Sequence, residues 1–263
     1  MRMSLWCLIV FAACGRAPAP DPTAEPVAPR PEPVVLSRTA LGRDATGVTI
    51  DAAGNRFVWV RGAGLHQVKP EGLTLTLAAS SLGMIDTPDF EDVALIDANR
   101  VALIARNEGF VIGLTNGQQL GRFCYLPEDV QQADPSAWQV SRALAYDAAE
   151  DRLYVQPQTF TGFGTLTGSQ MGMFDPEFPT PLEWQAFGEN NFSAGGMAVS
   201  SRQRTYLGMG TRLHQYDATA RRFDTWWDLF GTVRGIDGLA LDRQAGTLIV
   251  LDGVAQELVE LRL

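Results

Sequence analysis

A pattern of small and aliphatic residues recurs five times along the chain, each time followed by a turn and a run rich in β-branched and aromatic residues. The recurring runs occupy residues 47–51, 93–97, 143–147, 196–200 and 238–242. In four of the five the last residue is aspartate, and in the fourth copy it is Ser200. The copies begin about 40–50 residues apart, which is the length of a unit of four short strands. The pattern therefore predicts a repeated β-sheet unit.

The segments behind each recurring run supply the other strands of the unit. Second strands are expected at residues 56–60, 100–104, 152–155, 205–208 and 247–251, and third strands at 64–68, 109–113, 172–175, 212–216 and 257–261. Fourth strands are expected at residues 73–77, 119–125, 182–187 and 223–227. Residues 156–170, rich in glycine and threonine, are expected to form a long loop in the third unit.

The fifth unit has only three such strands before Leu263. A further β-rich segment, residues 34–41, precedes the first unit and can supply the missing outer strand. This arrangement closes the ring of a β-propeller and leaves no unfinished sheet edge. We therefore predict an all-β domain over residues 34–263, a five-bladed β-propeller of four-stranded antiparallel blades, in preference to a two-sheet β-sandwich.

Residues 48–60 resemble an NHL-type propeller repeat. Residues 90–94 with 106–108, and 237–242 with 251–252, resemble the SdiA-regulated and esterase-like phytase propellers. The resemblance extends over residues 34–263 as a pattern and implies the fold. The likeness to esterase-like propellers implies a calcium-dependent hydrolase.

The first thirty-three residues are typical of an export signal and a tether. Residues 1–13 combine Arg2 with an apolar run and small residues, as in a secretory signal peptide. Cys14 then ends a lipobox-like sequence, so we expect it to carry the lipid. Residues 14–33 contain seven prolines and are expected to form a disordered tether. The signal and the lipobox-like sequence predict an extracytoplasmic protein that is lipid-anchored to a bacterial membrane. Gly15, instead of aspartate, follows the cysteine, and in lipoproteins of this type this resemblance implies the outer membrane.

Charge and cysteine content narrow the classes of partner. The formal net charge is -9, and basic residues form no cluster, which excludes a nucleic-acid backbone as partner. Cys124 is the one cysteine beyond the export segment, so no internal disulfide is expected, and it is interpreted as a core residue. The expected partners are the membrane, through the anchor, and a protein or small molecule at the propeller face.

Polar residues precede the inner strands of several blades, and others follow the second strands. In a propeller the loops at both positions lie at the same mouth of the central channel, and binding residues often lie on such loops. The candidate ligand-binding residues there are Glu91, Asp92, Asn107, Glu108, Arg142, Asp237 and Asp252. Asp92 and Asp237 are the candidate metal ligands, and calcium is the ion that carboxylates would hold. No other cofactor is expected. The alternative is that these carboxylates are solvated or paired with arginine.

The sequence favours a non-catalytic binding scaffold over an enzyme. It contains neither a nucleophile-elbow motif nor a phosphate-binding loop, and we assign no catalytic residue. The alternative is a calcium-dependent lactonase, esterase or phosphatase that uses the acidic mouth. A five-bladed glycosidase ranks last, because it needs a carboxylate pair placed around a sugar and the sequence offers carboxylates without a recognisable glycosidase signature.

Overall fold

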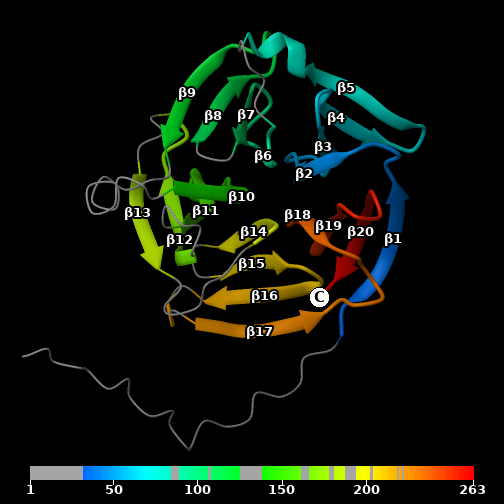
Figure 1. The fold of residues 1–263 in the computed structure, drawn as a ribbon. Coiled ribbons are helices and arrows are strands. Elements are labelled where there is room, and N and C mark those ends of the chain that lie inside the picture. The colour runs from blue at the N-terminus through cyan, green and yellow to red at the C-terminus, as the bar shows by residue number, and fades with distance from the viewer. Residues whose placement is uncertain are drawn as a thin grey trace, which may run out of the picture. The chain divides into compact units, whose positions relative to one another are not determined.

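Five antiparallel sheets of four strands form a ring in the computed structural model (Figure 1). The structure describes residues 32–83, 89–105, 108–124, 138–160, 166–177, 181–186, 194–201, 204–217, 219–220 and 222–263. The predicted five-bladed propeller is confirmed. Helical structure among these residues is one short 3-10 turn, η1 (Ala79–Leu82), and none of their helices is long and apolar enough to cross a membrane.

Each blade is built from four strands, ordered from the channel outward. Blade one consists of β2 (Ala45–Ile50), β3 (Arg56–Val60), β4 (Gly64–Lys69) and β5 (Gly72–Ala78). Blade two consists of β6 (Asp92–Leu95), β7 (Arg100–Ile104), β8 (Glu108–Gly113) and β9 (Gln119–Cys124). Blade three consists of β10 (Trp138–Asp147), β11 (Arg152–Phe160), β12 (Leu166–Phe174) and β13 (Pro181–Ala186). Blade four consists of β14 (Gly196–Ser201), β15 (Arg204–Met209), β16 (Arg212–Asp217) and β17 (Arg222–Asp228). Blade five consists of β18 (Ile236–Asp242), β19 (Thr247–Asp252), β20 (Glu257–Arg262) and β1 (Val34–Ala40).

The N-terminal strand β1 closes the ring, as predicted. It pairs antiparallel with β20, with Val35 opposite Leu261 and Ala40 opposite Glu257. Blade five is thus assembled from two segments at opposite ends of the domain (Figure 1). The pairing gives the outer face of β20 a hydrogen-bonding partner.

The five inner strands contact one another in sequence around the ring, from β2 through β6, β10, β14 and β18 back to β2. Their backbones come very close, which explains the glycines of the repeat. A Cβ atom on Gly47 would lie 2.5 Å from Oδ1 and 2.8 Å from Cα of Asp92. A Cβ atom on Gly196 would lie 2.6 Å from the Cα atom of Gly238. Only glycine permits this approach without displacing a neighbouring strand.

The aspartate that ends the repeat caps a turn. In four blades its Oδ1 accepts the backbone N–H two residues further on, over 2.7 to 3.0 Å. The pairs are Asp51–Ala53, Asp97–Asn99, Asp147–Ala149 and Asp242–Gln244. In blade four the hydroxyl of Ser200 donates to the carbonyl of Arg204 instead. The repeated aspartate is therefore explained by the hairpin between the first and second strands.

The hydrophobic core consists of five clusters, each between two neighbouring blades. Between blades one and two, Phe90 packs edge-on against Trp59 and Phe110, with ring centroids 5.2 and 5.9 Å away. All three side chains are buried. Burial between blades, rather than within one sheet, makes each blade depend on the next.

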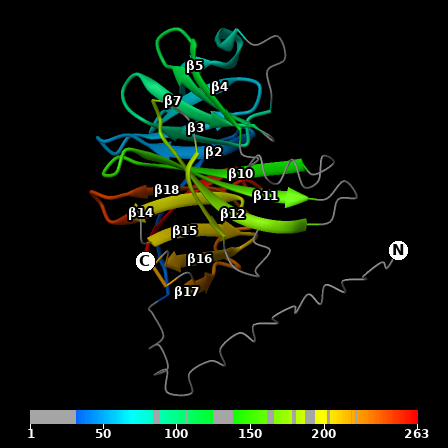
Figure 2. The same cartoon turned by 90° about the vertical axis from the view of Figure 1, so that its left-hand side faces the viewer.

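Blade three is longer than the sequence predicts. The expected loop over residues 156–170 was wrong at both ends, because β11 continues to Phe160 and β12 begins at Leu166. The extension is held by pairing with β10, where Val140 lies opposite Gln158. Gly168 of β12 lies opposite Thr159 of β11 in turn, and this backbone pairing offsets the low strand propensity of the glycine. The extended strands project beyond the other blades (Figure 2).

Candidate functional site

The inner strands run in the same direction through the ring, so their first residues gather at one mouth of the channel and their last residues at the other. We call these the first and the second mouth. A cavity of about 230 Å³ lies at the first mouth and one of about 590 Å³ at the second. The first-mouth cavity is lined by Asp44, Ala45, Thr46, Arg61, Glu91, Arg142, Gly195 and Asp237. Most of these residues are polar, and they come from all five blades or the loops that lead into them.

Three inner strands place a side chain in this cavity through an irregularity in pairing. The register shifts between Ala45 and Gly47 in β2, between Ser141 and Leu144 in β10, and between Ile236 and Gly238 in β18. The residues in these bulges include Thr46, Arg142 and Asp237, and all three line the cavity. A bulge turns an extra side chain away from its regular direction, which is why bulges often occur at binding sites.

Three charged side chains of the first-mouth cavity, those of Glu91, Arg142 and Asp237, have no hydrogen bond or ion pair with any residue that the structure describes. Glu91 is half-buried and fixed through its backbone N–H, which donates to the carbonyl of Ile104 at 2.7 Å. Arg142 and Asp237 are exposed. Their charged atoms are therefore available to a molecule in the cavity.

The environment of Asp237 is acidic and partly desolvated. Its carboxyl lies against the backbone of blade five, where a Cβ atom on Gly253 would be 1.7 Å from Oδ2. Desolvation is the main cause that raises the pKa of Asp237, and the Arg142 guanidinium opposes the rise. The carboxylates of Asp252, Glu91 and Asp44 raise this pKa further. A positive group placed beside Asp237 would relieve this repulsion.

The second arginine of the cavity is already paired. Nε of Arg61 lies 3.3 Å from Oδ2 of Asp44, and Nη1 lies 3.8 Å from Oδ2 of Asp89. Thr46 is also engaged, since its hydroxyl donates to the carbonyl of Phe90 at 2.8 Å. Arg142 is therefore the one arginine of this cavity without a partner among the described residues.

Asp92 lies in the protein interior, with no exposed surface. Its Oδ1 accepts the N–H of Val93 and its Oδ2 that of Leu144, each at 2.8 Å, and the N–H of Val48 also bonds to it. Burial raises the pKa of Asp92 well above its usual range, although these three amide donors, and chiefly that of Leu144, oppose the rise. This carboxylate joins the inner strands of blades one, two and three, and it is not part of the cavity wall.

The remaining predicted site residues that the structure describes do not line the first-mouth cavity. Asp252 is buried and caps two turns, accepting the N–H groups of Arg234, Val254 and Ala255 at 2.7, 3.1 and 2.9 Å. Glu108 forms an ion pair with Arg122 of β9. Asn107 and the proposed lipidation site Cys14 lie outside the described residues. Of the predicted set, the structure thus brings Glu91, Arg142 and Asp237 together around one cavity.

No group of three or more histidine, cysteine, aspartate or glutamate side chains within the described part of the chain is arranged to hold a metal ion. Calcium binding by Asp92 and Asp237 therefore stays a prediction. Neither the protein-family models nor the curated proteins compared with this chain give a match. The function has to be argued from the geometry of the cavities.

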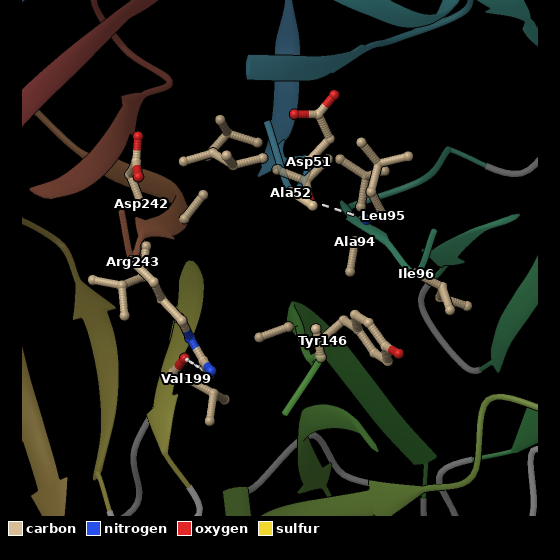
Figure 3. A pocket seen from close by; sticks show the side chains of 18 of the residues that line it. Asp51, Ala52, Ala94, Leu95, Ile96, Tyr146, Val199, Asp242 and Arg243 are labelled. Carbon is tan, nitrogen blue, oxygen red and sulfur yellow. Dashed lines mark hydrogen bonds between the residues drawn. The ribbon is translucent and has the colours of Figure 1, made fainter. Parts of the chain in front are cut away.

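Sequence reasoning missed the second-mouth cavity, which lies where the inner strands end (Figure 3). Its walls are mainly apolar, with Asp51, Asp242, Arg243 and Tyr146 among the polar residues. The sequence feature that corresponds to this cavity is the recurring run of small and aliphatic residues. Such a run is also typical of any buried strand, so it does not by itself indicate a cavity. Only the ring geometry shows that these runs surround a space.

Proposed function

We propose that this chain is a lipid-anchored, extracytoplasmic binding protein whose propeller holds a small polar molecule at the first mouth. The observation that carries the proposal is the convergence of Glu91, Arg142 and Asp237 from three different blades on one cavity, each without a partner among the described residues. Rigid strands rather than loops hold two of these three, because Arg142 belongs to β10 and Asp237 to β18. Such a preorganised arrangement is suited to ligand binding.

The charges indicate a ligand that carries both a positive and a negative group. The guanidinium of Arg142 offers planar donors that suit a carboxylate. Glu91 and Asp237 accept hydrogen bonds from an ammonium group, and a positive charge there offsets the repulsion that raises the pKa of Asp237. A cavity of about 230 Å³ suits a small molecule. An amino acid or the end of a short peptide has this chemistry.

The same residues favour binding over catalysis. The one hydroxyl among the described lining residues is that of Thr46, and it donates to the carbonyl of Phe90 instead of facing a base. A nucleophile needs an adjacent general base to react at neutral pH. The cavity supplies charges that orient a molecule, and this is the role we assign to them.

The binding proposal is tested by isothermal titration calorimetry with the full chain. The panel contains amino acids as zwitterions, together with matched amines and carboxylic acids that carry one charge each. We expect a zwitterion to bind, and the variants Arg142→Gln and Asp237→Asn each to weaken it by about tenfold or more. The control variants are Arg234→Gln and Glu71→Gln, which change exposed side chains outside the cavity. Binding that the cavity variants leave unchanged would overturn the proposal.

The anchor is tested separately in a bacterial host. The support for it is the apolar run before Cys14 and the proline-rich segment after it. We expect the wild-type chain to incorporate an alkyne-labelled fatty acid and to sediment with membranes, and Cys14→Ser to do neither. Two or more acyl chains give stable attachment, whereas one is marginal. Equal labelling of the Cys14→Ser chain would exclude this cysteine as the lipidation site.

A further inference from the structure

The second-mouth cavity is a separate site at the opposite end of the channel from the three unpaired charges. Its volume of about 590 Å³ lies within the range of about 300–1,000 Å³ that is typical of small-molecule pockets. All five blades contribute aliphatic residues to its lining, namely Ile50, Ile96, Leu144, Val199 and Leu241. Such walls favour hydrocarbon over water.

One cation in this cavity is held in a fixed position. Nη2 of Arg243 donates to Oδ1 of Asp147 at 2.7 Å and to the carbonyl of Val199 at 3.0 Å. Figure 3 shows the Arg243 side chain extending toward Val199, across the cavity from Ile96. Asp147 is almost fully buried, so the ion pair anchors the guanidinium. Nε and Nη1 of Arg243 have no partner among the described residues and remain free to donate.

Asp242, which precedes Arg243 in the sequence, also lines the cavity. Oδ1 of Asp242 accepts the N–H groups of Gln244 and Ala245, at 3.0 and 2.9 Å, whereas its Oδ2 has no hydrogen bond with any described residue. The two groups face different blades: Arg243 reaches Val199 of blade four, whereas a Cβ atom on Gly54 of blade one would lie 3.5 Å from Oδ2 of Asp242 (Figure 3). The free donors of Arg243 match the oxygen of an uncharged hydroxyl group, which accepts hydrogen bonds.

We propose that the second mouth binds an uncharged, mainly hydrocarbon molecule with a hydroxyl group at one end. The aliphatic walls take the hydrocarbon, and the hydroxyl oxygen accepts a hydrogen bond from Arg243. An anionic head group is disfavoured, because the charge of Arg243 is already balanced by Asp147 and the carboxylates of Asp51 and Asp242 lie at the same mouth. Burying a charge against these walls would also carry a desolvation cost.

The test uses the neutral fluorescent probe N-phenyl-1-naphthylamine and the full chain with Cys14→Ser, purified without detergent. We expect saturable enhancement of the probe's fluorescence and displacement of the probe by 1-decanol. Decanoate, which has the same chain length and a charged head, is expected to displace it at least about tenfold less effectively. Equal displacement by the two would overturn the uncharged head group, and the absence of saturable binding would overturn the site.

Rim variants locate the probe. Ala53 and Ala98 lie on exposed turns that line the cavity, and Ala149 lies on an exposed turn that does not. We expect Ala53→Trp combined with Ala98→Trp to weaken probe binding by about tenfold, and Ala149→Trp to leave it unchanged. Arg142→Gln, at the first mouth, is also expected to leave it unchanged. A probe that binds equally to the rim double variant lies elsewhere, and the proposal then fails without affecting the first-mouth site.

Discussion

The carboxylate of Asp92 accepts the backbone N–H of Leu144 at 2.8 Å, across the junction between blades two and three. The same side chain also accepts the N–H groups of Val93 and Val48. Inner strands expose one backbone edge to the channel, and buried amides there need acceptors. Asp92 supplies acceptors to three neighbouring blades at once, so its role is to hold the ring together at its narrow centre.

Replacing Asp92 by alanine is expected to lower the free energy of unfolding. The change leaves up to three buried amides without an acceptor, so we expect a loss of about 1–3 kcal/mol at about pH 5. Urea denaturation followed by tryptophan fluorescence measures it. Asp237→Ala is the control, because Asp237 has no hydrogen bond with the described residues. A loss no larger than in the control would contradict the structural role of Asp92.

The contribution of Asp92 is expected to depend on pH. Burial raises its pKa in the folded protein, whereas in the unfolded chain the value is about 3.9. Between these two values the folded protein binds more protons than the unfolded chain, so stability falls as the pH rises. The difference in unfolding free energy between wild type and Asp92→Asn should therefore be greatest below about pH 4 and decrease toward neutral pH. A difference that increases with pH would show that the pKa is not raised.

Glu260 is expected to show the opposite pH dependence at the ring closure. Burial raises its pKa, but hydrogen bonds from Arg56 and Ser37 outweigh this effect and lower it overall. The Arg56 and Ser37 donors lie 2.7 and 2.9 Å from Oε2, and the Thr247 hydroxyl lies 3.1 Å from Oε1.

Glu260→Gln should cost about 1–2 kcal/mol at neutral pH. The wild-type advantage is complete above the unfolded pKa of about 4.3 and is lost as the pH falls through the lower folded value. Unfolding curves between about pH 2 and pH 7 test this window. Glu71→Gln, in an exposed turn, serves as the control. An advantage that persists at the acid end would disprove the assignment.

Removal of the Arg243 guanidinium is expected to destabilise the propeller through Asp147. The variant Arg243→Met keeps an unbranched stem but leaves a buried carboxylate without its cation. We expect the free energy of unfolding to fall by about 1–3 kcal/mol. This loss is smaller than for a fully buried ion pair, because the Arg243 side chain is 39% exposed. The double variant Arg243→Met/Asp147→Asn should recover part of the loss. Additive effects in this double-mutant cycle would mean that the two side chains do not interact.

The number of blades and the ring closure could be predicted from the sequence, because the same strand pattern recurs in every blade at a similar spacing. The third blade was predicted less well. Its residues 156–160 and 166–170 have a composition that local propensity assigns to loops. Pairing of residues 156–160 with the extended β10, and of residues 166–170 with β11, overrides that propensity.

The different positions of Asp92 and Asp237 in the structure show why the site was only partly predictable. Both aspartates lie at the start of an inner strand, and the sequence gives them the same role. Asp92 pairs regularly, opposite Ile104, and its carboxylate lies in the interior. Asp237 lies at a bulge and reaches the first-mouth cavity. The bulge depends on pairing with β19, which local sequence patterns do not reveal.

The closure by β1 has a consequence for biosynthesis. Ser37 of β1 and Glu260 of β20, which share a hydrogen bond, are separated by 223 residues. Strand β1 leaves the ribosome early but finds its partner only when nearly the whole domain has been synthesised. Contacts between such distant segments form slowly, because a long loop has to close first. Until then β1 is an unpaired edge with Val34 and Leu36 open to other chains, so a nascent propeller of this kind benefits from a chaperone that shields its first strand.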